Sequence, residues 1–237
     1  MPHPSRLLCP LLLLLLALAP VAALPGAHAA LPGREAARLE HSAVPRPFTA
    51  NYRLEVRGWP DATIEHRLTR EDDHWQSRMS AAIAVARGRE RSRFIVEPQG
   101  VRSVHYASGY SLLGLGDDYR LTGEALAERP DRQTALFELS RRALTGDCQD
   151  AACRLDYQDH RGREERLDYR VLDRATIALP AGDFEAVRVE AIDPEKPERR
   201  LLFSFHPEFP GLLLAVDYHR DGQRQSRLSL TELAWPD

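Results

Sequence analysis

The sequence predicts a mainly β protein, built as a single curved antiparallel sheet of about ten or eleven strands with one mid-chain α-helix. Three observations lead to this fold class. Apolar and polar residues alternate in short segments from Phe48 onward, which is typical of strands with one buried face. Turn-forming Gly, Pro and Asp residues separate these segments, and only one segment has helical spacing. Such a sheet is expected to curl into a half-barrel or barrel-like shape.

The first half of the sheet is predicted from a hairpin and several further strands. Residues 48–56 and 62–68 alternate on either side of the turn Gly58-Trp59-Pro60-Asp61. Residues 75–85 continue the pattern as a long strand. Shorter strands are expected at 94–96, 101–106 and 119–122. The glycine-containing segment 107–118 is expected to be a loop.

The helix is predicted after residue 130. Asp131 is a good N-cap, and Leu136, Leu139 and Ala143 follow helical spacing. Gly146 is expected to end the helix, which gives it about three turns.

Alternating segments return after the helix. They lie at 155–157, 167–171, 177–179, 184–192, 201–205 and 212–218. The dipeptide Asp221-Gly222 is a strong signal for a two-residue hairpin and predicts a last strand through Leu228 and Leu230. Because most connections have hairpin length, neighbouring strands are expected to pair antiparallel.

The first 29 residues predict a cleaved secretory signal peptide. Arg6 precedes an almost wholly apolar run over residues 7–18, and small residues follow up to Ala29, after which cleavage is expected. The run is too short for a membrane span, which needs about 20 residues. The mature chain is therefore expected to be periplasmic, with no transmembrane segment. A lipoprotein is the alternative, but Cys9 precedes the apolar run where an acylated cysteine would follow it.

The rest of the chain is predicted to form a flexible leader and one domain. Residues 30–47 have three prolines, mixed charges and no apolar period, whereas residues 48–237 are expected to form a single antiparallel β domain. Loss of Arg6 leaves 31 basic residues against 35 acidic ones. This balance argues against nucleic acid as a partner.

Several stretches together resemble a bacterial exported family known as domain of unknown function 3108. They are "FTANYRLEVRGWPDATIEHRL", "DRQTALFELSRRAL", "DYRVLDRATIALPAGDFEAVRVEA" and "GLLLAVDYHRDGQRQSRLSL". The resemblance extends over residues 48–233. It implies a curved antiparallel sheet in the cell envelope of a Gram-negative bacterium, with a shape similar to the half-barrels that carry lipoproteins. It implies no activity.

Cys148 and Cys153 raise three alternatives: a metal clip, a redox pair or a disulfide. A thioredoxin-type pair has two intervening residues, whereas this pair has four. A zinc site needs about four ligands, and the nearest histidine, His160, stands alone. Once Cys9 leaves with the signal peptide, an even pair remains in an oxidising compartment, so a disulfide is predicted.

No catalytic residue, metal site or cofactor is predicted. Ser111 lies in "GYSLLG", which lacks the glycine spacing of a nucleophile elbow. The histidines that follow the signal peptide show neither the i, i+4 nor the i, i+2 spacing of a metal site. His66 falls on the apolar face of its strand and is interpreted as a hydrogen-bonded interior histidine. Whether distant histidines and acids converge is left open, but the absence of motifs favours a non-enzymatic protein.

The interior of a curled sheet can be packed or can hold a ligand. Trp75 and Met79 on one strand, with Phe203 and Phe205 on another, are candidates to line a cavity, and ordinary core packing is the alternative.

A row of arginines gives a second candidate site. Arg87, Arg89, Arg91 and Arg93 recur at every second residue, so an extended segment places all four on one face. Such a row can bind a phosphate, a lipid head group or an acidic glycan. The alternative is a charged edge or hairpin tip that discourages aggregation, with Glu90 between the arginines.

These observations favour a binding or envelope-maintenance module whose partner is a hydrophobic or lipid-like molecule or an envelope protein. One alternative is a hydrolase of an envelope polymer, with acids and histidines brought together by the fold. Another is a structural module that binds a protein partner through an exposed apolar patch.

Overall fold

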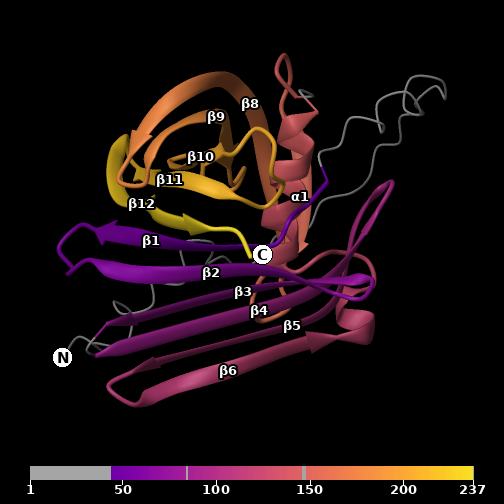
Figure 1. Cartoon of the computed structure of the whole chain (residues 1–237). Helices are drawn as coiled ribbons and strands as arrows, with labels where there is room; N and C mark the ends of the chain where they lie inside the picture. The colour runs from indigo at the N-terminus through magenta and orange to yellow at the C-terminus, as the bar shows by residue number, and fades with distance from the viewer. Residues whose placement is uncertain (1–43, 84, 146–147, 237) are drawn as a thin grey trace, which may run out of the picture.

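The computed structural model describes residues 44–83, 85–145 and 148–236 (Figure 1). The predicted signal peptide, its cleavage site and residues 30–43 of the predicted leader lie outside this part. The described chain forms one open sheet of twelve antiparallel strands, with the helix α1 (Arg132–Leu144) across its concave side. The predicted fold class is therefore confirmed, with twelve strands in place of ten or eleven.

The strands follow the chain in two runs of six. The first run is β1 (Phe48–Val56), β2 (Ala62–Glu71), β3 (His74–Ile83), β4 (Ala86–Glu97), β5 (Gly100–Leu112) and β6 (Leu115–Thr122). A short 3-10 helix, η3 (Gly123–Leu126), and α1 then lead to the second run. That run is β7 (Cys153–Gln158), β8 (Glu164–Leu179), β9 (Gly182–Ile192), β10 (Arg199–Phe205), β11 (Leu213–Arg220) and β12 (Gln223–Ala234).

The two ends of the β domain meet in the middle of the sheet, where β1 pairs with β12. The strand order is β6-β5-β4-β3-β2-β1-β12-β11-β10-β9-β8-β7, so β6 and β7 are the edge strands. The edges approach each other near the start of α1. The Gln158 amide donates to the Pro130 carbonyl oxygen at 2.9 Å, and the rings of Tyr119 and His160 are 4.9 Å apart. The sheet stays open, and α1 spans the gap between its edges.

Several sequence expectations about strand boundaries were wrong. The strand expected over residues 75–85 ends at Ile83, and the short strand expected at 94–96 is the end of β4, which begins at Ala86. Segment 107–118 is not a loop but the hairpin of β5 and β6, with Leu113 and Gly114 at φ of 51° and 84° in its turn. The sequence hides this hairpin because leucine rarely adopts positive φ. Segments 167–171 and 177–179 are both part of the long strand β8, whose register shifts between Val171 and Asp173.

The alternation of each strand places apolar side chains on the concave side. Across the centre of the sheet, Leu54, Leu228, Val216, Phe203 and Val189 are neighbours in register from β1 to β9. All five are buried and belong to one core cluster. The outer side carries the alternating polar residues, as expected for a sheet with one solvated face.

Candidate functional site

A pocket of about 120 Å³ lies between the concave side of the sheet and the first turn of α1. It is open to solvent and draws its walls from both halves of the sheet. The apolar walls come from Leu54, Ile64, Met79, Ala81, Leu136, Leu201, Phe203, Leu213, Val216 and Leu228. The helix α1 crosses the sheet near the end where β1 begins, whereas the β3–β4 and β5–β6 turns, called the hairpin tips below, lie at the other end (Figure 1).

Of the four residues predicted to line a cavity, two line the pocket and two do not. Met79 and Phe203 line the pocket. Trp75 and Phe205 share the concave face with them but are packed into the core, with exposed fractions of 5% and 1%. Phe205 stacks on Phe203 with ring centroids 5.5 Å apart, so it supports the pocket wall from behind.

The pocket has one polar corner, formed where β4 meets α1. The Glu90 carboxylate and the Arg132 guanidinium form an ion pair in which both side chains are almost fully buried. Gln133 donates from Nε2 to Glu90 Oε2 at 3.1 Å. Within the described residues, the Oε1 atom of Gln133 is buried and accepts no hydrogen bond. A buried amide oxygen without a donor is costly, so the polar corner is incompletely satisfied within the described residues.

This polar corner was not predicted from the sequence. Glu90 was interpreted only as a charge between arginines, although its position in β4 places it on the opposite face from them. That face is the concave one, where Glu90 is 6% exposed. An acid at an inward position of an alternating strand was the available signal, but its partners Arg132 and Gln133 lie on a helix whose placement the sequence does not determine.

A buried polar hub fixes where α1 begins. Asp131 is fully buried and caps the helix, as predicted, with Oδ1 accepting from the amides of Gln133 and Thr134. Its Oδ2 accepts from the hydroxyls of Ser92 and Ser103, each at 2.7 Å, and from Thr134 Oγ1 at 2.8 Å. Burial raises the pKa of the Asp131 carboxyl, and these hydrogen bonds oppose that rise. The hub ties the first turn of α1, and with it the polar corner, to β4 and β5.

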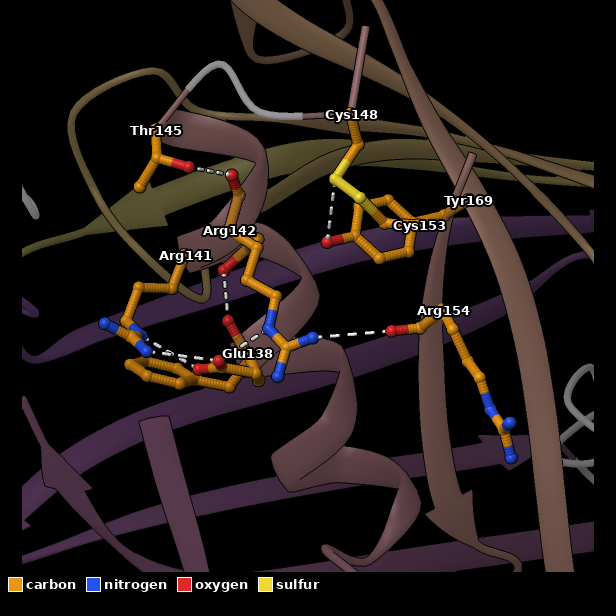
Figure 2. A network of polar contacts seen from close by, with 10 residues as sticks. Glu138, Arg141, Arg142, Thr145, Cys148, Cys153, Arg154 and Tyr169 are labelled. Carbon is orange, nitrogen blue, oxygen red and sulfur yellow. Dashed lines mark hydrogen bonds and ion pairs between the residues drawn. A yellow bond between two sulfur atoms is a disulfide. The ribbon is translucent and has the colours of Figure 1, made fainter. Parts of the chain in front are cut away.

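The far end of α1 is tied to β7 (Figure 2). Cys148 and Cys153 form a disulfide with Cα atoms 5.5 Å apart, and the Tyr169 hydroxyl donates to Cys148 Sγ at 3.4 Å. On the helix, Arg142 pairs with Glu138 and donates to the Arg154 carbonyl oxygen at 3.4 Å. The helix ends at Leu144, and the predicted stop at Gly146 lies outside the described residues. The cysteines thus hold one corner of the fold and lie away from the pocket.

The arginine row lies on the outer side of the sheet. Arg87, Arg89 and Arg91 are exposed and Arg93 is partly exposed, all on β4. Because β4 lies two strands in from the edge strand β6, the row does not protect a sheet edge.

The part of the chain that the structure describes offers few other candidates for a functional site. There, no group of three or more His, Cys, Asp and Glu side chains is placed to hold a metal ion. His66 shares a hydrogen bond of 2.9 Å with Ser77 in the core, and burial lowers its pKa to about 4. No helix among the described residues combines the length and apolar character needed to span a membrane.

Comparisons with solved structures find proteins of similar shape. A chain in the MucA/MucB complex of Pseudomonas aeruginosa matches with 17% identity and a TM-score of 0.42, over 86% of this chain and 57% of that chain. A candidate exported protein with a YmcC-like fold from Bacteroides fragilis matches with 10% identity and a TM-score of 0.38, over 81% and 98%. A candidate lipoprotein from Parabacteroides distasonis matches with 10% identity and a TM-score of 0.36, over 80% and 95%.

These likenesses concern general shape and do not extend to function. The chain spans little more than half the length of the MucB chain that it matches. No protein-family model and no curated protein matches the chain. The resemblance to domain of unknown function 3108 therefore stays a prediction.

Proposed function

We propose that this chain is an exported, periplasmic, non-enzymatic module that holds one hydrophobic or lipid-like molecule in the pocket beside α1. The proposal includes cleavage after Ala29 and a single domain over residues 48–237. The observation that carries it is an open, apolar-walled pocket of about 120 Å³ in the middle of an otherwise packed concave side. The disulfide between Cys148 and Cys153 supports an oxidising compartment.

The size of the pocket limits the ligand. Its volume is comparable to that of an apolar cavity of about 150 Å³, which accepts a molecule of the size of benzene. It therefore accommodates a short length of acyl chain or a small ring and not a whole lipid. Since the pocket is open to solvent, the rest of a longer ligand can extend out of it.

The polar corner gives the ligand a preferred direction. Gln133 Oε1 is a buried acceptor without a donor among the described residues, and a rotation of this side chain would present it to the pocket, whereas the charges of Glu90 and Arg132 neutralise each other. A fatty alcohol is therefore expected to bind more tightly than its methyl ether, by about fivefold for one added hydrogen bond. Replacement of Gln133 by Leu should remove this preference, whereas a preference that survives would contradict the assigned orientation.

A first test is native mass spectrometry of protein purified from the periplasm, followed by solvent extraction. The proposal expects a bound mass that is lost on extraction and is identified as a lipid or another apolar molecule. A protein that carries no such molecule and also fails to bind added fatty alcohol would contradict it.

A second test compares one substitution at two neighbouring residues of β3. Ala81 lines the pocket, and Ala82 is exposed on the outer side. Ala81→Leu should weaken the binding of a fluorescent fatty-acid probe by about tenfold or more, because the added side chain occupies the apolar space. Ala82→Leu should leave probe binding unchanged. Equal binding by both variants would place the probe elsewhere.

No observation favours the hydrolase alternative. The pocket contains one carboxylate, Glu90, which is already paired with Arg132, and no histidine is among its lining residues. The geometry that acid-base hydrolysis needs is therefore not assembled at this site.

A further inference from the structure

The tips of the β3–β4 and β5–β6 hairpins carry an exposed apolar edge. Among the described residues, six large hydrophobic side chains are exposed, and three of them lie at these tips. Leu113 is 75% exposed and Leu115 is 79% exposed in the β5–β6 hairpin, and Val85 is 45% exposed between β3 and β4. The Leu113 amide donates to the Val85 carbonyl oxygen at 2.8 Å, so the two tips form one edge.

Leu113 is also an unfavourable residue for its place in the turn. Its φ of 51° lies in the left-handed region, which bulky L-residues rarely adopt and which Asn or Gly would occupy at lower cost. An exposed leucine in a strained turn contributes nothing to the core. Strain of this kind persists where the side chain has a role outside the fold.

The arginine row begins next to this edge and runs away from it along the outer side of the sheet. Arg89 is paired with Asp118 at 2.9 Å, but both side chains are largely exposed, so the pair is weak. Within residues 44–83, 85–145 and 148–236, Arg87, Arg91 and Arg93 have no carboxylate within ion-pair distance.

The charge of this surface is only partly compensated within the sheet, because Asp118 pairs with Arg89 alone. Arg91 faces Arg78 directly across β3 and β4, although like charges in this position destabilise a sheet. Small residues lie beside the row at Ser80 and Ala107, and the guanidinium groups of Arg87, Arg89 and Arg91 are exposed. An external anionic surface would relieve the repulsion.

We propose that the tips with Val85, Leu113 and Leu115 dock on an anionic lipid bilayer, with the leucines in the interfacial region and the nearest arginines on lipid phosphates. An exposed apolar edge beside basic residues has the composition of a peripheral membrane contact. The orientation is tip-first, because the most exposed apolar side chains are at the tips and not along the row. This surface goes beyond the proposed function, since it lies outside the pocket and requires no bound ligand.

In a tip-first orientation, the contribution of each arginine to membrane binding should decrease along the row from Arg87 to Arg93. Arg87 is two residues from Val85, whereas Arg93 lies six residues farther along β4, about 20 Å away in an extended strand. That separation is about two and a half times the Debye length of about 8 Å at physiological salt. Arg87 should therefore contribute most to binding and Arg93 least. An acidic polymer lying along the row would instead contact all four arginines about equally.

The test is co-sedimentation of the protein, as purified from the periplasm, with vesicles of phosphatidylcholine alone or of equimolar phosphatidylcholine and phosphatidylglycerol. Binding should be tighter to the anionic vesicles and should weaken with salt. The double variant Leu113→Asn, Leu115→Ser should bind about tenfold or more weakly. Asn tolerates the positive φ of residue 113, so this variant should fold.

Single arginine variants test the gradient. Arg87→Gln should weaken binding about fivefold and Arg93→Gln less than about twofold. Leu172→Ser and Arg174→Gln alter exposed residues of β8 and should have no effect. Equal binding to neutral and anionic vesicles, equal losses from Arg87→Gln and Arg93→Gln, or no loss from the leucine variant would each overturn the proposal. Ala81→Leu should bind vesicles as the unaltered protein does. The membrane proposal and the proposal of a ligand in the pocket can therefore fail independently.

Discussion

At the end of the sheet where β1 begins, α1 fills the concave side with Phe137, Leu139 and Ala143, all of which are buried. Toward the turn between β3 and β4 the same concave side is not filled by α1 and retains an open pocket. Both ends have the same alternation of apolar residues, so the difference comes from the position of one helix. The fastening of α1, and not the composition of the strands, therefore decides where the packed core ends and the pocket begins.

The largest expected effect is on the free energy of unfolding, and it should differ between two neighbouring residues of α1. Phe137 packs on Phe94 with ring centroids 4.8 Å apart at the covered end, whereas Leu136 lines the pocket. Phe137→Ala should reduce the free energy of unfolding by about 4 kcal/mol, because it leaves a cavity in packed core. Leu136→Ala should cost only about 1 kcal/mol, because its side chain already faces open space. Urea denaturation measures both, and equal costs would show that the two ends are packed alike.

Substitution of Asp131, the centre of the buried polar hub, should have the next-largest effect on the free energy of unfolding. Asp131→Ala should cost about 3 kcal/mol, because it removes the helix cap and leaves the hydroxyls of Ser92 and Ser103 without their acceptor. Asp131→Asn should cost less, since its remaining oxygen can still accept from the Gln133 and Thr134 amides. Both variants are to be measured by thermal and urea unfolding. If Asn and Ala had equal costs, the cap would contribute nothing and the helix would be held by packing alone.

Reduction of the disulfide should have a smaller effect at the other end of α1. The loop closed by Cys148 and Cys153 is short, so its loss should destabilise the protein by about 2 kcal/mol. The melting temperature should fall when a reductant is added, and a Cys148→Ser, Cys153→Ser variant should melt at the reduced value with or without it. Free thiols in the unreduced protein would contradict this account.

The smallest effect concerns pH, near the contact between the two sheet edges. Burial, followed by the negative charges of Asp159 and Asp193, raises the pKa of Glu165 to about 7. The folded state thus holds this proton more tightly than the unfolded chain does, so Glu165 favours folding below about pH 4.5 and loses that contribution as pH rises through 7. Because the side chain is half-buried, the effect is discounted to about 1 kcal/mol.

Glu165→Gln isolates this group. Relative to the unaltered protein, the variant should gain about 1 kcal/mol between pH 4.5 and pH 8, because other titrating groups cancel in the difference. Urea unfolding across this range measures the gain. A difference that does not change with pH would mean that Glu165 titrates normally.

Local pattern predicted most of the fold. The alternation identified the strands, Asp131 identified the start of the helix, and Asp221-Gly222 identified a hairpin whose residues have φ of 51° and 74°. Each of these signals depends on a few consecutive residues. Segment 107–118 was missed because its turn carries an unusual leucine at residue 113.

The site was less predictable, because it depends on where α1 lies. Trp75 and Met79 are on the same face of the same strand, and only the position of the helix makes one core and the other pocket wall. The polar corner of Glu90, Arg132 and Gln133 joins residues about forty positions apart, and no local pattern brings them together. The spacing of the four arginines predicted that they share one face of a strand. Whether that strand lies at the edge of the sheet depends on the strand order, which the sequence does not give.

The central claim is that a hydrophobic molecule occupies the pocket beside the first turn of α1. The most direct measurement is photo-crosslinking of the protein with a diazirine-bearing fatty acid, followed by mass-spectrometric mapping of the labelled peptides. The account predicts labels on the pocket walls, at residues such as Met79, Leu136 and Phe203, and their loss in Ala81→Leu but not in Ala82→Leu. Labels that fall only on the exposed tips, or that are equal in both variants, would contradict it.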